Sequence, residues 1–226
     1  HLMRIPESMS FEEAACVCES YITAFLNVFI LGKLGDGQIA LLHGGGGGVN
    51  TAAVQLCKAL VPNTKLIVTA SPEKMDRVRQ LGVDLVVNYK ETPDFSEAVK
   101  EFTGKRGVDV ILDHIGARYL EPNMNSLAYA GRLVLIGVTS GIKAELNLGL
   151  MMVKRQRIIG SVLRSRPVSE KGEIVAEFTR RALPKFADRS IVPLIEKVFP
   201  LEEVQAAHRM MEEDRHFGKI VLKTGS

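Results

Sequence analysis

Residues 38–60 have the sequence QIALLHGGGGGVNTAAVQLCKAL, in which three different patterns follow one another. Residues 38–43 form a short, nearly continuous apolar run, which is typical of a strand buried on both faces of a sheet. A run of five glycines follows, and residues 49–60 then carry small and apolar side chains at helical spacing. The sequence therefore predicts a strand, a glycine-rich turn and a helix.

The same alternation continues along the chain. Further strands are expected at residues 65–70, 84–87, 108–112, 132–136 and 157–163, and helices at 72–82, 95–102 and 121–128. Strands and helices that alternate at this spacing are joined by right-handed crossovers, which give a parallel sheet covered on both faces. The predicted fold class is therefore α/β, with a doubly wound parallel sheet of the Rossmann type.

The pattern changes after about Ser165. Residues 170–186 and 201–213 are predicted to be helices, and residues 194–199 and 219–222 are predicted to be strands. These last strands have few partners, so a second sheet is not expected from them.

Composition narrows the class of protein. The 226 residues are 46% hydrophobic and 24% charged, which is average for a globular domain. The net charge of +3 is spread along the chain, so no nucleic-acid partner is expected. No apolar stretch is expected to reach the roughly 18 residues of a membrane span, and no leader is apparent, so no membrane partner is expected. The odd number of cysteines, three, favours a reducing compartment and a cytoplasmic location.

The glycine turn is a candidate anion site, because a strand, a glycine-rich turn and a helix point free backbone N–H groups and a helix dipole at a ligand. In a G-x-G-x-x-G frame, Gly45 and Gly47 match and Asn50 takes the place of the third glycine. The Asn50 side chain must then find a partner, or the helix must stand away from the strand. A P-loop is excluded, because Val49 and Asn50 follow Gly48 where lysine and serine or threonine are required. A tight turn without a ligand is the alternative.

The second strand points to the cofactor. It ends at Thr69-Ala70-Ser71 without the acidic residue that usually binds the ribose hydroxyls of NAD. Ser71 and Lys74 stand there instead, and a hydroxyl beside an ammonium suits a 2′-phosphate. This favours NADPH over NADH. In the alternative interpretation, Ser71 only caps a helix and Lys74 is a solvated helix residue.

Several short motifs, spread over nearly the whole chain, follow one another in the same order as in a known family. They lie at residues 5–7, 12–15, 23–25, 43–45, 48–49, 51–56, 88–90, 111–113, 115–116, 163–166 and 218–222. In these motifs the sequence resembles the zinc-independent quinone oxidoreductases of the medium-chain dehydrogenase/reductase superfamily, and within them the p53-inducible quinone oxidoreductase branch most closely. The resemblance implies NADPH-dependent reduction of quinones or related electron-poor carbonyl compounds by hydride transfer.

The resemblance also assigns cofactor contacts. It places the pyrophosphate at Gly47, Gly48 and Val49, next to Gly45 and Asn50, and the 2′-phosphate at Ser71, Lys74 and Tyr89; Thr23 and the segment that begins at Gly137 lie near the nicotinamide. Asn50 and Gly47 depart from the usual residues of the loop. No catalytic side chain is assigned, because the cofactor carries the chemistry of hydride transfer.

Members of this family begin with a barrel-like, GroES-like catalytic domain of roughly 100 residues. The expected division is therefore residues 1–19 as the end of that domain, 20–165 as the NADP-binding Rossmann domain and 166–226 as a return segment of the catalytic domain. We expect the chain to lack most of the catalytic domain, to bind NADPH and to reduce quinones poorly. A non-catalytic NADPH-binding module and an enoyl-thioester reductase of the same superfamily are the alternatives.

Other candidate sites are weaker. No metal site is expected, because Cys16 and Cys18 are too close in sequence for a usual zinc pair. His43 and His114, at strand ends, are possible acid or base groups, although a structural role is favoured. A homodimer is expected, because residues 157–163 would form an edge strand free to pair with a second copy.

Overall fold

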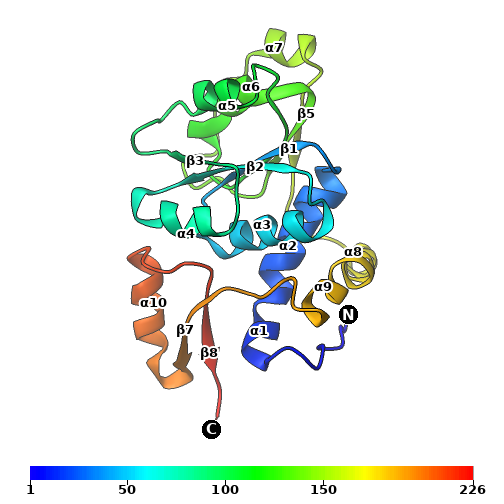
Figure 1. Cartoon of the computed structure of the whole chain (residues 1–226), viewed down its shortest axis with the longest axis vertical. Coiled ribbons are helices and arrows are strands. Elements are labelled where there is room, and N and C mark those ends of the chain that lie inside the picture. Colours follow the sequence, from blue (N-terminus) through cyan, green and yellow to red (C-terminus); the bar gives the residue numbers. More distant parts are fainter. Residues whose placement is uncertain (226) are drawn as a thin grey trace.

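The computed structural model describes residues 1–225 (Figure 1). A six-stranded parallel sheet has the order β3-β2-β1-β4-β5-β6. Its strands are β1 (Ile39–His43), β2 (Lys65–Ala70), β3 (Leu85–Asn88), β4 (Val108–Asp113), β5 (Leu127–Leu135) and β6 (Arg157–Gly160). The predicted doubly wound α/β fold is confirmed.

Helices cover both faces of this sheet, α3 and α4 on one and α5 and α6 on the other (Figure 1). Successive side chains of a strand point to opposite faces. Ala40 and Leu42 therefore pack with one core cluster, and Leu41 packs with the other. The helices are α3 (Gly48–Leu60), α4 (Met75–Gln80), α5 (Ser96–Phe102), α6 (Leu120–Ser126) and α7 (Leu148–Val153).

Two strand boundaries differ from the prediction. The helix expected to continue to residue 128 ends at Ser126, and β5 begins at once at Leu127, because that segment turns into the sheet beside Val108. The strand expected at 157–163 ends at Gly160, where its pairing with Leu135 ends.

A helical rod from Phe11 to Leu31 precedes the sheet, and the sequence interpretation did not predict it. It consists of α1 (Phe11–Ala15), α2 (Ile22–Phe25) and the π-helical turns Val17–Tyr21 and Leu26–Leu31. The Ser10 hydroxyl accepts the Glu13 N–H and the Glu13 carboxylate accepts the Ser10 N–H, so a capping box starts the rod. The rod also runs across the boundary expected between residues 19 and 20, which separates the end of the catalytic domain from the Rossmann domain.

The rod corrects the expectation that no stretch approaches a membrane span. Its 21 residues are long and apolar enough for one, and 61% of the most apolar window is buried inside the fold. The physical reason is that the rod is a core helix: Val17, Tyr21 and Phe25 pack in the cluster that also holds residues of α3 and of the helix Val168–Arg181.

The C-terminal part consists of α8 (Val168–Arg181), α9 (Leu183–Ala187), β7 (Ile195–Pro200), α10 (Val204–Glu212) and β8 (Lys219–Lys223). The single helix predicted at 170–186 is interrupted at Ala182, and α9 begins anew with Pro184 in its first turn. The expectation that no second sheet forms is wrong, because β7 and β8 pair with each other in parallel, with α10 as their crossover. An isolated parallel bridge from Gly218 to Gly47 ties this unit to the glycine turn.

Candidate functional site

A cleft of about 360 Å³ opens at the carboxyl ends of the central strands. In doubly wound sheets this edge is where ligands bind. The lining residues are Gly44, Gly45, Gly46, Gly47, Thr69, Ser71, Lys74, Tyr89, His114, Ile115, Arg118, Tyr119, Thr139, Ser140 and Asp214. The structure thus brings together five of the residues predicted from the sequence: Gly45, Gly47, Ser71, Lys74 and Tyr89.

The glycine turn forms one wall, and its close packing requires residues without a side chain. Gly44 has φ +83°, in the left-handed region that favours glycine. A Cβ on Gly45 would lie 2.7 Å from Val78 and 2.8 Å from Val68. A Cβ on Gly46 would collide with the stem of Lys74, which crosses over this residue. The turn is therefore a cradle of bare backbone, which fits the close approach of a phosphate.

Three other predicted residues, Gly48, Val49 and Asn50, do not line this cleft. The buried Asn50 side chain turns back, and its Nδ2 donates to the carbonyl of His43. This contact answers how the helix accommodates an asparagine in place of the third glycine. A Cβ on Gly48 would lie 2.6 Å from the Lys219 side chain, so β8 packs closely here. The assignment of these residues to the pyrophosphate stays a prediction.

The residues predicted for a 2′-phosphate line the cleft beside the glycine turn. Ser71 is buried and occupies the N-cap position of the turn Pro72–Lys74, but its hydroxyl makes no capping hydrogen bond. The Lys74 side chain is 12% exposed, so it is not a solvated helix residue. Its Nζ lies 2.5 Å from Oδ1 of Asp214, a residue that the sequence interpretation did not connect with the site.

A second ion pair lies near these residues. Lys90 Nζ is 3.1 Å from Glu73 Oε1. A hydrogen bond from the backbone, the Lys90 ammonium and the Ser71 hydroxyl together lower the pKa of Glu73 to about 2. Glu73 is therefore a carboxylate at neutral pH.

Beneath the cleft, a chain of hydrogen bonds links three of the strand ends. Asp113 accepts from the N–H of Ile115 at 2.6 Å and from Asn123 Nδ2 at 3.0 Å. Asn123 Oδ1 lies 2.7 Å from His43 Nε2, so this nitrogen donates, and His43 Nδ1 accepts from the Thr69 hydroxyl at 3.0 Å.

Burial sets the charge states of this chain of residues. It raises the pKa of Asp113 to about 6 and lowers the pKa of His43 to about 3. His43 is 1% exposed and packs against the rings of Phe95 and Tyr119, which also contact each other. His43 therefore supports the wall of the cleft and does not face a substrate. His114 lines the cleft, and burial lowers its pKa, so its imidazole is neutral.

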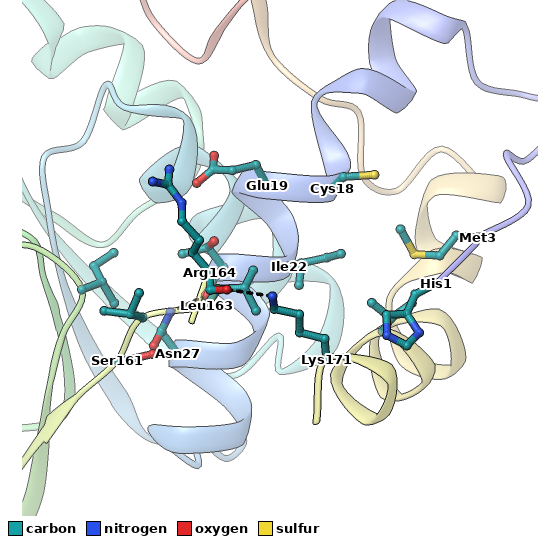
Figure 2. Close-up of a pocket in the computed structure, with 14 residues that line it drawn as sticks. His1, Met3, Cys18, Glu19, Ile22, Asn27, Ser161, Leu163, Arg164 and Lys171 are labelled. Carbon is teal, nitrogen blue, oxygen red and sulfur yellow. Dashed lines mark hydrogen bonds between the residues drawn. The ribbon is translucent and has the colours of Figure 1, made fainter. Parts of the chain in front are cut away.

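A larger cavity of about 680 Å³ lies beside the helical rod (Figure 2). Thr23, predicted to lie near the nicotinamide, lines it together with Ile136 and Leu163. Gly137 follows Ile136, and a Cβ there would lie 2.9 Å from the His114 carbonyl, so the strand ends of β4 and β5 meet at this point. The residues predicted for the 2′-phosphate and Thr23 thus line two separate hollows, and Gly137 lines neither of them.

Two further residues of the larger cavity escaped the sequence interpretation. Asn27 and Ser161 both line it, and Figure 2 shows them next to each other. The buried Asn27 Oδ1 and Ser161 Oγ have no hydrogen-bond partner among residues 1–225. A carboxamide such as that of nicotinamide offers both a donor and an acceptor for such atoms.

The comparison with known families decides the class of this chain. Residues 48–180, from the glycine turn to the end of α8, match the model of the family described as zinc-binding dehydrogenase. The chain belongs to this family. The zinc-binding dehydrogenases are part of the medium-chain dehydrogenase/reductase superfamily of oxidoreductases, and their Rossmann domain implies a nicotinamide cofactor.

Three relatives illustrate the family. The synaptic vesicle membrane protein VAT-1 homolog of Homo sapiens is 31% identical over 98% of this chain and 59% of its own length. The structure of an NAD-dependent alcohol dehydrogenase is 33% identical, with a TM-score of 0.84, over 100% of this chain and 62% of that one. The structure of the CurK enoyl reductase is 29% identical, with a TM-score of 0.82, over 99% and 65%. This dehydrogenase-family chain thus spans about 59% to 65% of the length of these relatives.

The family name does not by itself assign a metal to this chain. Within residues 1–225, no three histidine, cysteine, aspartate or glutamate side chains gather where they could hold a metal ion. All three cysteines are free thiols, with Cys16 and Cys57 buried and Cys18 exposed. Burial raises the pKa of Cys16 to about 11, so this thiol is protonated.

Sequence reasoning missed part of the cleft for identifiable reasons. Thr69 stands at the end of a predicted strand, so the rule that ligands bind at the carboxyl edge was a usable signal, and the same edge holds His114, which the sequence had already suggested as an acid or base group. Arg118 and Tyr119 belong to the short turn before α6 and carried no motif. Asp214 is 140 residues from Lys74 in the sequence, and only the folded C-terminal unit brings the two together.

Proposed function

We propose that this chain binds NADPH and serves the reduction of quinones or related electron-poor carbonyl compounds by hydride transfer. The observation that carries the proposal is that Ser71, Lys74 and Tyr89 line the same cleft as the glycine turn. The end of β2 contributes a hydroxyl and not a carboxylate at this place. A hydroxyl, an ammonium and a phenol suit the 2′-phosphate that distinguishes NADPH from NADH.

The protein supplies position and environment for this chemistry. A bound nicotinamide cofactor supplies the hydride, and the reaction needs its ring held against the acceptor in a dry site. The N-terminus of α3 and the bare glycine turn offer positive potential to the phosphates. Thr23, Asn27 and Ser161 line the larger cavity, to which Ile136 and Leu163 contribute apolar surface.

The proposal is tested by titrating the chain with NADPH and with NADH while following cofactor fluorescence. We expect saturable NADPH binding, and we expect Lys74→Met to weaken it on the order of tenfold while NADH binding stays unchanged. Lys100→Met is the matched control, because Lys100 is partly exposed, pairs with Glu97 on α5 and does not line the cleft or the hollow beside it. If the wild type bound NADPH and NADH equally well, and Lys74→Met bound both as the wild type does, the 2′-phosphate site would be rejected.

Enoyl-thioester reduction is a second candidate activity. It is supported by the likeness to the CurK enoyl reductase, at 29% identity and a TM-score of 0.82. The oxidation of NADPH in the presence of a benzoquinone or of an enoyl thioester separates the two. Saturable cofactor binding without turnover of either acceptor would instead identify a non-catalytic NADPH-binding module.

We also propose that the chain forms a homodimer through the edge of the large sheet. β6 is the last strand in the sheet order and has a neighbour on one side only. The exposed Val162 follows it, and the exposed Met152 and Val153 precede it at the end of α7. An unpaired edge beside apolar side chains favours association with a second copy.

A further inference from the structure

Residues 213–218 connect α10 to β8, and one of them, Asp214, lines the cleft. Residues 213–217 also line a neighbouring hollow of about 440 Å³, which they share with Ser71 and Lys74. The N–H of Gly218 donates to the carbonyl of Gly46 at 2.9 Å, so the segment is fixed directly to the glycine turn. Phe217 is buried, and the Arg77 guanidinium lies over its ring at 4.4 Å from the centroid. Arg77 also pairs with Glu196 of β7 at 2.7 Å. The segment is therefore held by its backbone hydrogen bond to Gly46 and by the cation–π contact of Phe217 with Arg77, and the N–H of Phe217 also donates to Glu196 at 3.1 Å.

This arrangement sets Asp214 against Lys74. The carboxylate oxygen lies 2.5 Å from the ammonium, and the Lys74 side chain is 12% exposed while that of Asp214 is 69% exposed. Lys74 cannot easily turn elsewhere, because its stem lies on Gly46. Asp214 has φ +51°, a conformation that aspartate and asparagine adopt more readily than most residues. The backbone therefore presents this carboxylate to the cleft.

The other charges nearby are already used. Glu73 pairs with Lys90, Glu196 with Arg77, and Glu213 with Arg215. Asp214 is the carboxylate among the described residues that pairs with Lys74. A 2′-phosphate bound at Lys74 would have to displace the Asp214 carboxylate or lie next to it. Both groups are negatively charged, so they repel each other when they share one ammonium.

We propose that Asp214 is a specificity-determining residue of the cofactor cleft: it competes with the 2′-phosphate for Lys74 and so reduces the preference for NADPH over NADH. This inference rests on the proposed function, since it concerns the same site. It adds a residue from the C-terminal unit to the recognition of the adenosine end.

The test uses two small ligands that differ only in the group in question, adenosine 2′,5′-bisphosphate and adenosine 5′-monophosphate. Each is titrated by calorimetry into the wild type, Asp214→Asn and Glu213→Gln. Asparagine keeps the shape and tolerates the left-handed backbone, while Glu213→Gln is the matched control because its carboxylate pairs with Arg215. We expect Asp214→Asn to bind the bisphosphate about tenfold more tightly and the monophosphate within about twofold of the wild type.

The increase in bisphosphate affinity of Asp214→Asn must also depend on Lys74. In the double variant Asp214→Asn/Lys74→Met, the advantage for the bisphosphate is expected to disappear, which a double-mutant cycle measures directly. An unchanged bisphosphate affinity in Asp214→Asn, or an equal gain for both ligands, overturns the inference while wild-type binding of the bisphosphate leaves the proposed function standing. Failure of the wild type and of every variant to bind either ligand overturns both.

Discussion

At the scale of single residues, burial shifts the pKa values of two groups beneath the cleft. His43 and Asp113 are both buried at strand ends. Burial keeps His43 neutral down to about pH 3 and keeps Asp113 protonated up to about pH 6, so at pH 7 His43 is neutral and Asp113 is a carboxylate. Their effects on stability have opposite signs. Burial of His43 favours folding at high pH, whereas burial of Asp113 favours folding at low pH.

His43 carries a prediction about pH. Its pKa falls from 6.5 to about 3 on burial, so its contribution to stability is complete above pH 6.5 and is lost as the pH falls towards 3. His43→Gln cannot titrate, so we expect its stability deficit against the wild type to shrink between pH 7 and pH 5. Urea unfolding at several pH values measures this difference. The control His208→Gln removes an exposed histidine and is expected to keep the wild-type slope; a deficit that does not change with pH in His43→Gln would contradict the prediction.

Single residues also show where sequence reasoning was strongest. The missing acid after β2 and the presence of Ser71 and Lys74 were visible in the sequence, and these two residues line the same cleft as Tyr89. Asn27, Ser161 and Asp214 were not visible, because their place depends on contacts between distant segments. No local pattern marks a polar atom that will be left without a partner in a core.

At the scale of elements, the alternating strands and helices were predictable and the helical rod was not. Buried parallel strands have an apolar sequence that is easily distinguished from the helices between them. The rod from Phe11 to Leu31 is buried on several sides, so its apolar residues show no single stripe at helical spacing. The pairing of β7 with β8 was missed because the two strands are separated in the sequence by α10 and pair only with each other.

The rod is predicted to be a main source of stability. Phe25 is fully buried and packs edge-on against Phe178 of α8, with ring centroids 5.5 Å apart. Phe25→Ala is expected to lower the free energy of unfolding by about 3–5 kcal/mol, because it removes a large buried side chain and leaves a cavity. Phe11→Ala, at the 82% exposed start of the same rod, is the control and is expected to change it by about 0.5 kcal/mol or less. Equal losses in denaturant unfolding would show that the rod does not anchor α8.

At the scale of the whole molecule, the large sheet and the C-terminal unit meet at the glycine turn. The isolated bridge between Gly47 and Gly218 and the ion pair between Lys74 and Asp214 are both contacts of this junction. The large sheet remains open at β6, on the side away from β3 in the strand order.

The open edge gives a prediction about assembly. We expect the wild type to elute as a dimer, with its mass measured by light scattering, and Val162→Asp to shift it towards the monomer because a charge beside the edge strand opposes apolar contact. Val162 is 61% exposed, and the control Val168→Asp changes a valine that is 73% exposed at the start of α8. A wild type that is monomeric at all concentrations, or equal effects of the two substitutions, would contradict a dimer through β6.

The ion pair between Lys74 and Asp214 joins two residues that are synthesised at different times. Domains fold as units during synthesis, from the N-terminal side onwards. Strands β1 and β2 and the glycine turn are synthesised before Asp214, and Lys74 can meet this partner only after 140 further residues have been added. Until then the carboxylate of Asp214 is not available to offset the positive charge of Lys74.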